Sequence, residues 1–254
     1  MENCFQKYIK IPHLEEVLSI LDNPVEVYEK IDGGNVQIRK TQGRVLCGSR
    51  AHYITREEHF RFPWFKNFQK WALGNYSFYS LPEDLIVFGE WSAKHTLDYK
   101  PEFTDRFFLT DIFDLQQKKF IPYNEGKKKL VEIGIKEIIF LKTLLSDYTT
   151  KEKLEKMVSD SDYREGDKEG LVIKNYTTQK FAKLWTRFVR LKKGIITQPD
   201  IKSISLSLID AGEDVTKGRL MEEILKDFNG GRRNVPVDKI ETEVDRFFDT
   251  ASKK

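Results

Sequence analysis

The stretch Glu29-Lys30-Ile31-Asp32-Gly33-Gly34-Asn35 decides the interpretation of this chain, because it places a lysine in a short turn between two strand-like segments. Residues 25–28 (Val-Glu-Val-Tyr) alternate apolar and polar side chains, and residues 36–39 (Val-Gln-Ile-Arg) do the same. Alternation with a period of two predicts a strand, a Gly-Gly turn and a second strand. A lysine in such a turn can act as a nucleophile, although an exposed lysine beside a hairpin is also a common surface charge.

Length and composition are those of a soluble protein. The 254 residues suffice for one large domain with a small appendage, and no apolar run of about 18 residues predicts a membrane span. The first residues lack the apolar core of a signal peptide, so we expect an intracellular, cytoplasmic protein. Two cysteines cannot build a disulfide framework, and the four histidines have no metal-ligand spacing, so a structural zinc site is not expected.

The basic residues are unevenly placed. The net charge is only +3, but the stretch from Lys180 to Lys193 contains no acidic residue. Its basic residues are Lys180, Lys183, Arg187, Arg190, Lys192 and Lys193. A polyanion such as a nucleic acid is one interpretation, and a solvated face beside a linker is the other.

Two kinds of pattern divide the chain. Up to about Trp185, short β-branched and aromatic runs predict strands at residues 45–47, 85–88, 107–109 and 171–173. Between them, apolar residues at roughly helical spacing predict a helix over Lys127 to Leu145, and Leu154, Met157 and Val158 mark a second helix that begins near Thr149 or Thr150. This mixture predicts an α+β domain over residues 1–194.

The C-terminal part is predicted to be helical. Residues 220–228 form an amphipathic stripe that ends at Asn229-Gly230-Gly231, and a second stripe over residues 240–248 begins after Pro236. We therefore predict a small helical domain over residues 195–254.

Four further motifs follow the lysine turn in order. They are Phe88-Gly89-Glu90-Trp91, the segment 107–113 (Phe-Phe-Leu-Thr-Asp-Ile-Phe), the segment 169–174 (Glu-Gly-Leu-Val-Ile-Lys) and the segment 181–185 (Phe-Ala-Lys-Leu-Trp). In order and spacing they resemble the motif series of the covalent nucleotidyltransferases, the superfamily of ATP-dependent nucleic-acid ligases and GTP-dependent capping enzymes. The resemblance implies an antiparallel-sheet nucleotidyltransferase domain.

The details are most similar to RNA ligases of the phage T4 RNA ligase 2 type. Asn35 matches the asparagine of that family's K-x-x-G-x-N pattern, and Lys94, Asp98 and Tyr99 match its Lys-x-x-x-Asp-Tyr stretch. Such enzymes join a 3′-hydroxyl to a 5′-phosphate, which implies RNA as the substrate and a role in RNA repair. DNA ligases and capping enzymes add an OB-fold after the last motif, and the helical tail is too short for that barrel.

The resemblance assigns the chemistry to three lysines. Lys30 would attack the α-phosphate of ATP to form lysyl-AMP, which requires a deprotonated amine and thus a pKa lowered from about 10.4. If Lys174 and Lys183 converge on the site, their charges would lower the pKa of Lys30 and stabilise the phosphate.

Polar residues of the motifs are assigned to the nucleotide and its metal ion. Asp32 or Glu169 could hold Mg²⁺ or Mn²⁺, since carboxylates together with phosphate oxygens and water suit these ions. Glu90 suits a ribose hydroxyl. By resemblance, Arg50 would contact the sugar or phosphate and Asn35 the phosphate side, and the remaining nucleotide-binding positions of the lysine turn would be Glu29 and Gly33.

Two positions depart from the family pattern. Thr110 stands where the family shows an aromatic residue, and strand alternation suggests Phe108 as the substitute that stacks on adenine. Trp185 stands where the family shows a second lysine, so Lys180 or Arg187 would have to supply that charge.

Three other functions remain open from the sequence. The chain could join DNA or mixed RNA/DNA ends, it could be a guanylyltransferase that uses GTP, or it could bind nucleic-acid ends without chemistry. The sequence predicts neither the natural substrate, which could be a nicked duplex, a tRNA loop or single strands, nor the oligomeric state.

Overall fold

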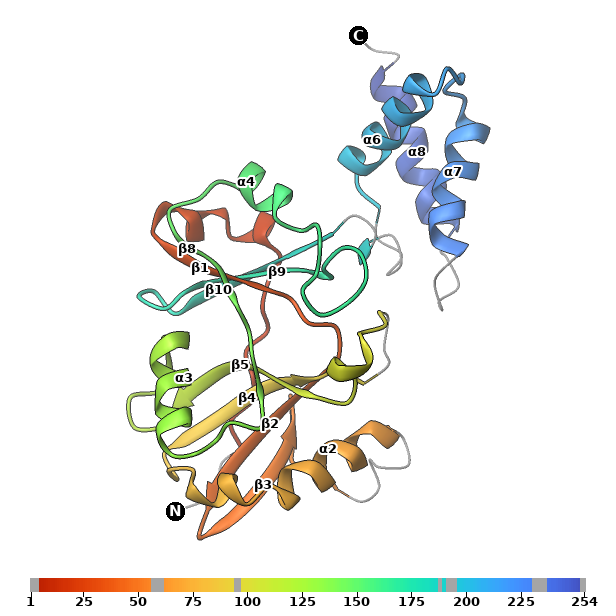
Figure 1. Cartoon of the computed structure of the whole chain (residues 1–254). Coiled ribbons are helices and arrows are strands. Elements are labelled where there is room, and N and C mark those ends of the chain that lie inside the picture. The colour runs from red at the N-terminus through yellow and green to blue at the C-terminus, as the bar shows by residue number, and fades with distance from the viewer. Residues whose placement is uncertain are drawn as a thin grey trace. The chain divides into compact units, whose positions relative to one another are not determined.

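The structure is a computed structural model that describes residues 5–55, 62–93, 97–186, 189–190, 196–229 and 237–251. The chain divides into two compact units, residues 1–184 and 185–254. The first unit contains both β-sheets, and the described part of the second is mainly helical (Figure 1). The domain boundary predicted after residue 194 falls at residues 191–195, which lie outside the described residues. No helix in the described ranges is long and apolar enough to cross a bilayer.

The larger sheet of the first unit has six strands. Five follow the order β3-β2-β4-β5-β6, and β7 adds to β5. All neighbours are antiparallel except β7, which is parallel to β5. The strands are β2 (Gly34–Thr41), β3 (Arg44–Ser49), β4 (Leu85–Trp91), β5 (Phe107–Asp114), β6 (Lys119–Ile121) and β7 (Ile139–Phe140).

The smaller sheet has four strands in the order β10-β9-β1-β8. The central strand β1 pairs antiparallel with both β8 and β9, and its register places Glu26 opposite Lys174 and Glu29 opposite Leu171. The strands are β1 (Val25–Glu29), β8 (Thr143–Asp147), β9 (Gly170–Asn175) and β10 (Lys180–Trp185).

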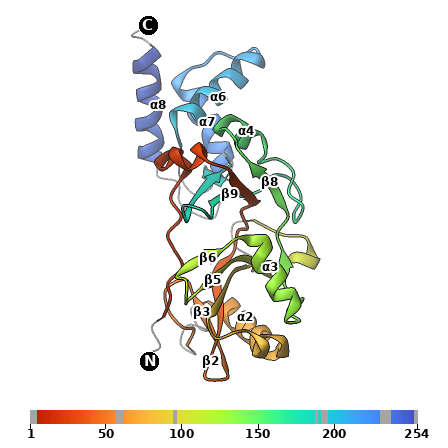
Figure 2. The ribbon, with the colours of Figure 1, turned by 90° about the vertical axis from the view of Figure 1, so that its left-hand side faces the viewer.

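Apolar side chains join these layers. Ile86, Phe88, Phe113 and Phe120 of the larger sheet pack with Phe181 of the smaller one, so this cluster lies between the sheets. Figure 2 shows the sheets as separate layers of the first unit. The short helices α4 (Lys151–Lys156), η1 (Leu14–Glu16) and η2 (Leu18–Asp22) cover the other face of the smaller sheet with Leu154, Leu14 and Ile20.

The remaining helices of the first unit pack on the larger sheet or lie in its connections. They are α2 (Pro63–Gly74), η3 (Tyr76–Ser80), η4 (Pro101–Phe103) and α3 (Tyr123–Glu132). Phe65, Phe68 and Ala72 of α2 are buried in the main core. The sequence interpretation did not include α2, although this spacing of apolar residues is typical of one helical face.

The single helix predicted over Lys127 to Leu145 is wrong. The helix α3 ends at Glu132, and Gly134 adopts a left-handed conformation with φ of 87°. Glycine takes this conformation without the steric cost of a Cβ, which ends the helix. The following apolar residues enter β7 and β8 instead. The second predicted helix is confirmed as α4, where the Thr150 hydroxyl accepts a hydrogen bond from the Lys153 N–H.

The described part of the second unit includes α6 (Gln198–Asp210), α7 (Lys217–Asn229) and α8 (Val237–Ala251). Its core contains Ile201, Ile204, Leu208, Leu220, Ile224, Ile240 and Val244. The two predicted helices are confirmed as α7 and α8, and α6 is additional. The predicted end signals Gly230, Gly231 and Pro236 lie outside the described residues. The predicted α+β class, with antiparallel sheets and helices at the C-terminus, is confirmed.

Candidate active site

Lys30 and Glu169 meet where two neighbouring strands share an end. Lys30 follows the last residue of β1, and Glu169 precedes the first residue of β9. Because β1 and β9 are antiparallel, these two positions lie side by side, and the Lys30 N–H donates to the Gly170 carbonyl at 2.9 Å. The Lys30 Nζ lies 2.7 Å from the Glu169 Oε2, with side-chain exposures of 21% and 0%. The predicted nucleophile is thus paired with a buried carboxylate.

Carboxylates surround the Lys30 amine. Burial opposes its charge, but the carboxylates of Glu169, Glu90 and Asp32 together outweigh burial, so the pKa of Lys30 is raised. The expectation that neighbouring lysines lower this pKa is therefore wrong for the ligand-free chain. The site as it stands holds the ammonium form, and losing the proton requires that some of this negative charge be offset.

Glu90 and Asn35 face each other across two strands of the larger sheet. Asn35 of β2 is the register partner of Glu90 of β4, so the two side chains project from the same face. Burial raises the pKa of Glu90 to about 7, against the opposing charge of Lys30. The Asn35 amide also donates to the Gly89 carbonyl, while its Oδ1 is buried without a hydrogen-bond partner. This unsatisfied oxygen is a candidate acceptor for a ligand hydroxyl.

The backbone of the lysine turn is fixed from two sides. The Asp32 N–H donates to the Tyr99 hydroxyl at 2.6 Å, and the Asp32 carboxylate accepts from the Leu97 N–H at 2.7 Å. A Cβ added at Gly33 would lie 2.3 Å from the Trp91 carbonyl oxygen, so only glycine fits there. Tyr99 belongs to the Lys-x-x-x-Asp-Tyr stretch noted in the sequence, whose Lys94 lies outside the described residues. No role was predicted for Tyr99 from the sequence, and the structure places it at the site.

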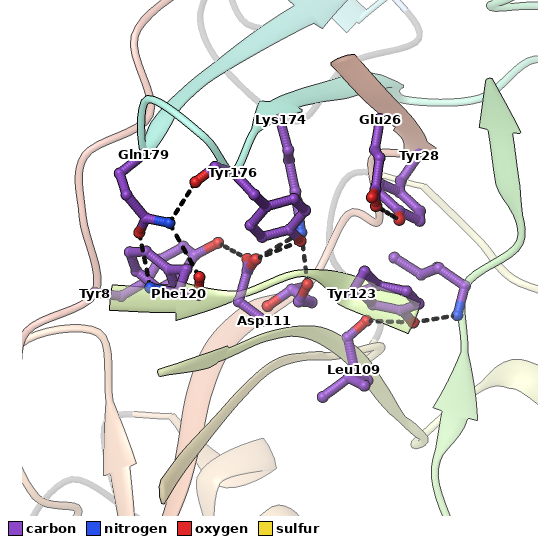
Figure 3. Close-up of polar contacts among 12 residues, drawn as sticks. Tyr8, Glu26, Tyr28, Leu109, Asp111, Phe120, Tyr123, Lys174, Tyr176 and Gln179 are labelled. Carbon is purple, nitrogen blue, oxygen red and sulfur yellow. Dashed lines mark hydrogen bonds and ion pairs between the residues drawn. The ribbon is translucent and has the colours of Figure 1, made fainter. Parts of the chain in front are cut away.

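Lys174 does not lie beside Lys30 in the ligand-free chain, and its predicted catalytic role stays a prediction. Lys174 is the register partner of Glu26. Glu26 precedes Lys30 by four residues, which corresponds to about 13 Å along the strand. Its buried Nζ lies 2.8 Å from the Asp111 Oδ1 and 2.5 Å from the Thr110 carbonyl oxygen (Figure 3). The aromatic rings of Tyr28, Tyr123, Tyr176 and Phe181 surround it. Lys174 is therefore an ion-paired residue of the protein interior.

Lys183 is better placed for the predicted role. It lies two residues after Phe181 on β10 and shares the face of that strand that packs toward the larger sheet. A short turn, residues 176–179, joins β9 to β10, so β10 runs in the opposite direction to β9. Lys183 is therefore closer than Lys174 to the end of the sheet where Lys30 lies. Its backbone N–H donates to the Pro12 carbonyl at 3.0 Å.

Three other predicted residues make contacts within the protein in the ligand-free structure, although Phe108 is the register partner of Glu90. Phe108 is fully buried, and its ring packs on the rings of Tyr99, Phe103 and Tyr163, so no face is open to adenine. The Arg50 guanidinium donates to the Ile9 carbonyl at 3.1 Å. The Glu29 carboxylate accepts from the Ser161 hydroxyl, in the loop before β9.

The assignment of Phe108 assumed regular strand alternation, and a bulge interrupts it. Phe88 pairs with Asp111 and the next residue, Gly89, pairs with Leu109. Thr110 is therefore an extra residue of β5, and its hydroxyl is buried without a hydrogen-bond partner. Of the two suggested substitutes for the missing lysine, Lys180 is exposed and Arg187 lies outside the described residues.

The predicted metal ligands Asp32 and Glu169 are both buried. The described ranges contain no cluster of three His, Cys, Asp or Glu side chains arranged to hold a metal ion alone. A magnesium ion at this site would therefore take phosphate oxygens and water to complete its shell, which is how magnesium is usually held beside nucleotides. The two carboxylates fit that partial role.

Comparison with known proteins identifies the family. The family model described as RNA ligase matches residues 23–189, which is more than half of the chain and includes every motif from the lysine turn to Trp185. The chain belongs to the RNA ligase family. The predicted RNA ligase resemblance is thereby confirmed, while membership of the phage T4 RNA ligase 2 group stays a prediction. No curated protein sequence matches the chain significantly.

Solved RNA ligase structures share the fold. The structure of Naegleria gruberi RNA ligase with PPi is 18% identical, with a TM-score of 0.54, and the match covers 76% of this chain and 59% of that one. A variant of the same ligase with ATP and Mn is 16% identical with a TM-score of 0.53, and the shares covered are again 76% and 59%. This RNA ligase family member therefore spans less than two thirds of the length of the ligase that it resembles.

Proposed function

We propose that this chain is an ATP-dependent RNA ligase that seals 3′-hydroxyl and 5′-phosphate ends through AMP bound covalently to Lys30. The observation that carries the proposal is the partly exposed Lys30 side chain, whose amine pairs with the buried Glu169 carboxylate and feels the charges of Glu90 and Asp32, inside the segment that matches the RNA ligase family. The fold neighbour solved with PPi and, as a variant, with ATP and Mn supports a nucleotide at this place. A role in RNA repair follows from this activity.

The reaction consists of three substitutions at phosphorus. The Lys30 Nζ attacks the α-phosphorus of ATP, forms the P–N bond and releases pyrophosphate. The 5′-phosphate of the RNA then attacks the same phosphorus, which breaks the P–N bond and returns the amine. Finally the 3′-hydroxyl attacks the adenylylated 5′-phosphate and AMP leaves. One site can serve all three steps if the adenylate stays bound, because its own phosphorus reacts in the first two steps and the adjoining phosphorus of the RNA 5′-phosphate reacts in the third.

Deprotonation of Lys30 is the first requirement. The Glu169 carboxylate accepts a hydrogen bond from the ammonium and orients the Nζ, but it also raises its pKa. A divalent metal ion held by Asp32 and Glu169 would offset their negative charge, favour the neutral amine and screen the triphosphate.

Glu90 and Asn35 are proposed to bind the ribose and phosphate side of the nucleotide. A carboxylate accepts hydrogen bonds from hydroxyl groups, and the buried Oδ1 of Asn35 has no partner in the protein. A ribose hydroxyl that donates to this Oδ1 would remove the cost of leaving it unsatisfied. Lys183 is proposed to contact phosphate from the smaller sheet.

The proposal predicts a covalent label. Incubation with α-labelled ATP and Mg²⁺ should give covalently bound AMP in the wild type and none in Lys30→Ala or Lys30→Arg, and the label should survive alkali but be released by acid, as expected of a P–N bond. Lys118→Ala, at an exposed lysine of the turn between β5 and β6, is the matched control and should label fully. A wild-type protein that takes no label from ATP rules out the proposal, and labelling by GTP instead would indicate a guanylyltransferase.

A separate experiment tests whether the enzyme seals RNA or DNA ends. Nicked, gapped and single-stranded ends of RNA and DNA are offered to the labelled enzyme, and sealing of RNA 3′-hydroxyl ends is expected to be fastest. Sealing confined to DNA ends contradicts the RNA assignment. A labelled enzyme that seals no end contradicts the ligase assignment.

A further inference from the structure

The exposed face of α2 carries an unusual mixture of side chains. Phe62, Lys66, Lys70 and Leu73 are spaced by three or four residues, so they form one stripe along the helix, and all four are exposed. The buried residues Phe65, Phe68 and Ala72 hold the opposite face against the larger sheet. The stripe is thus presented to solvent by a helix that is itself firmly packed.

Exposed aromatic rings continue beyond the helix. Tyr76 is 85% exposed and Tyr79 is 44% exposed, and their ring centroids lie 6.3 Å apart in η3. The Lys40 Nζ of β2 donates to the Tyr79 carbonyl at 3.1 Å, which places another cation beside these rings. Neighbouring aromatic rings that are this exposed mark a candidate binding surface.

The charge of this surface has one sign. Residues 62–81 contain Lys66 and Lys70 and no aspartate or glutamate. Neither lysine forms an ion pair within the described part of the chain. Glu83, just beyond this segment, accepts from the Gly43 N–H of the β2–β3 turn and lies near Lys40. The stripe itself therefore attracts anions without competition from its own acids.

The same helix begins at the catalytic turn. The ring of Trp64, in the first turn of α2, packs on Gly34 so closely that an added Cβ would lie 2.0 Å from it. Gly34 lies four residues after Lys30 in the same turn. From Trp64 to Leu73 the helix rises about 14 Å, so the stripe leads away from the Lys30 site over several nucleotides.

We propose that the stripe Phe62, Lys66, Lys70 and Leu73, together with Tyr76 and Tyr79, is a binding surface for the RNA strand beside the end that is being sealed. This inference rests on the proposed RNA ligase function and adds the path that the polynucleotide takes across the larger sheet. The two lysines contact phosphates, and the tyrosine rings stack on bases. Stacking tolerates any base, so the surface binds strands without reading their sequence.

The test measures RNA affinity without ATP, so that no chemistry intervenes. Fluorescence anisotropy is recorded with a 5′-phosphorylated single-stranded RNA and with a nicked RNA duplex, over a series of salt concentrations. The decisive variants are Lys66→Gln/Lys70→Gln and Tyr76→Ala/Tyr79→Ala, on the probe that the wild type binds more tightly. The matched control is Lys118→Gln/Lys119→Gln, an exposed lysine pair at the opposite edge of the same sheet.

Each variant has its own expected signature. The lysine variant should lower the slope of log affinity against log salt by about 1.4 on the single strand or about 1.8 on the duplex, at about 0.7 or 0.9 for each phosphate that a lysine no longer neutralises. The tyrosine variant should weaken binding at least about fivefold at every salt concentration, with little change of slope. The control should match the wild type. If both variants match the control, or if the wild type binds neither probe, the surface assignment is wrong.

A second readout separates this inference from the proposed function. Because the stripe lies outside the Lys30 cluster, both variants should form lysyl-AMP from ATP at the wild-type rate. A variant that labels fully but binds RNA weakly supports the surface. A wild type that takes no label refutes the proposed function, whereas the anisotropy result still decides whether the surface binds RNA.

Discussion

The Lys174 ammonium lies 2.8 Å from the Asp111 carboxylate, and this buried ion pair joins the two sheets of the first unit. Asp111 belongs to β5 of the larger sheet and Lys174 to β9 of the smaller one. The second oxygen of Asp111 accepts a hydrogen bond from the Tyr8 hydroxyl at 2.5 Å, so the same carboxylate also binds the N-terminal segment. Three parts of the chain therefore depend on one side chain.

Removing one partner of this pair should be costly for stability. Asp111→Ala leaves the Lys174 charge buried without compensation, and we expect the free energy of unfolding to fall by about 3–5 kcal/mol. The double variant Asp111→Leu/Lys174→Met removes both charges and should recover most of the loss. Urea denaturation of the wild type and the variants measures this, and a double variant no more stable than Asp111→Ala would contradict it.

The raised pKa of Lys30 should depend on Glu169. With Glu169→Gln, one negative charge is removed and the pKa of Lys30 should fall. Acetylation of Lys30 at a series of pH values, measured by mass spectrometry without ATP or metal, should reach half its maximum at a lower pH in the variant. Acetylation of the exposed Lys118 in the same samples is the internal control. Identical Lys30 profiles in both proteins would argue against the ion pair.

The ion pair also links stability to pH. Because the pKa of Lys30 in the folded chain lies above its unfolded value, the pair stabilises the fold fully below about pH 10 and loses that contribution as pH rises through the raised pKa. The wild type should therefore lose more stability than Glu169→Gln at strongly alkaline pH, as measured by thermal unfolding in matched buffers.

Glu90 should make the fold less stable as pH rises through neutrality. Burial raises its pKa from 4.5 to about 7, so the folded chain binds more protons than the unfolded chain between these values. Stability then falls with rising pH, by about 3 kcal/mol in total for a shift of this size. Between pH 5 and pH 8, Glu90→Gln should lose correspondingly less stability than the wild type in denaturant titrations. Parallel curves for the two proteins would refute the shift.

Gly33 should tolerate no side chain. A Cβ there would lie 2.3 Å from the Trp91 carbonyl oxygen, and backbone cannot move aside as a flexible side chain can. We expect Gly33→Ala to lower lysyl-AMP formation at least tenfold, because a displacement of about 1 Å at a reacting group costs that much or more. Gly74→Ala at the end of α2, where an added Cβ meets nothing within 4 Å, is the control and should label like the wild type. A Gly33→Ala protein with full labelling would show that the turn has room to adjust.

Local patterns in the sequence predicted several features well. The alternation around Lys30 predicted β1 and β2, and Thr150 marked the start of α4. The order of motifs predicted the family. These features depend on neighbouring residues, whose side-chain period or capping chemistry is visible without knowledge of the fold.

Other features depend on contacts between distant segments. The bulge at Thr110 reversed the alternation on which the choice of Phe108 depended, and no local signal marks it. The helix α2 was missed because its many aromatic residues resemble strand composition, although its buried positions follow a helical period. The roles of Tyr99 and Trp64 follow only from the backbone positions that they contact.

The sequence by itself determined which residues can carry the chemistry: a lysine in a glycine turn, carboxylates at strand ends and the family to which their order belongs. Only the tertiary structure decided which of them meet. Lys30 and Glu169 are 139 positions apart and become neighbours because β1 and β9 pair antiparallel with their ends aligned. Lys174 lies farther along β9, at a distance from Lys30 that corresponds to four residues of a strand. Its ammonium is buried against the Asp111 carboxylate instead. Strand register sets these distances, and register is determined by packing across the whole sheet rather than by any one motif.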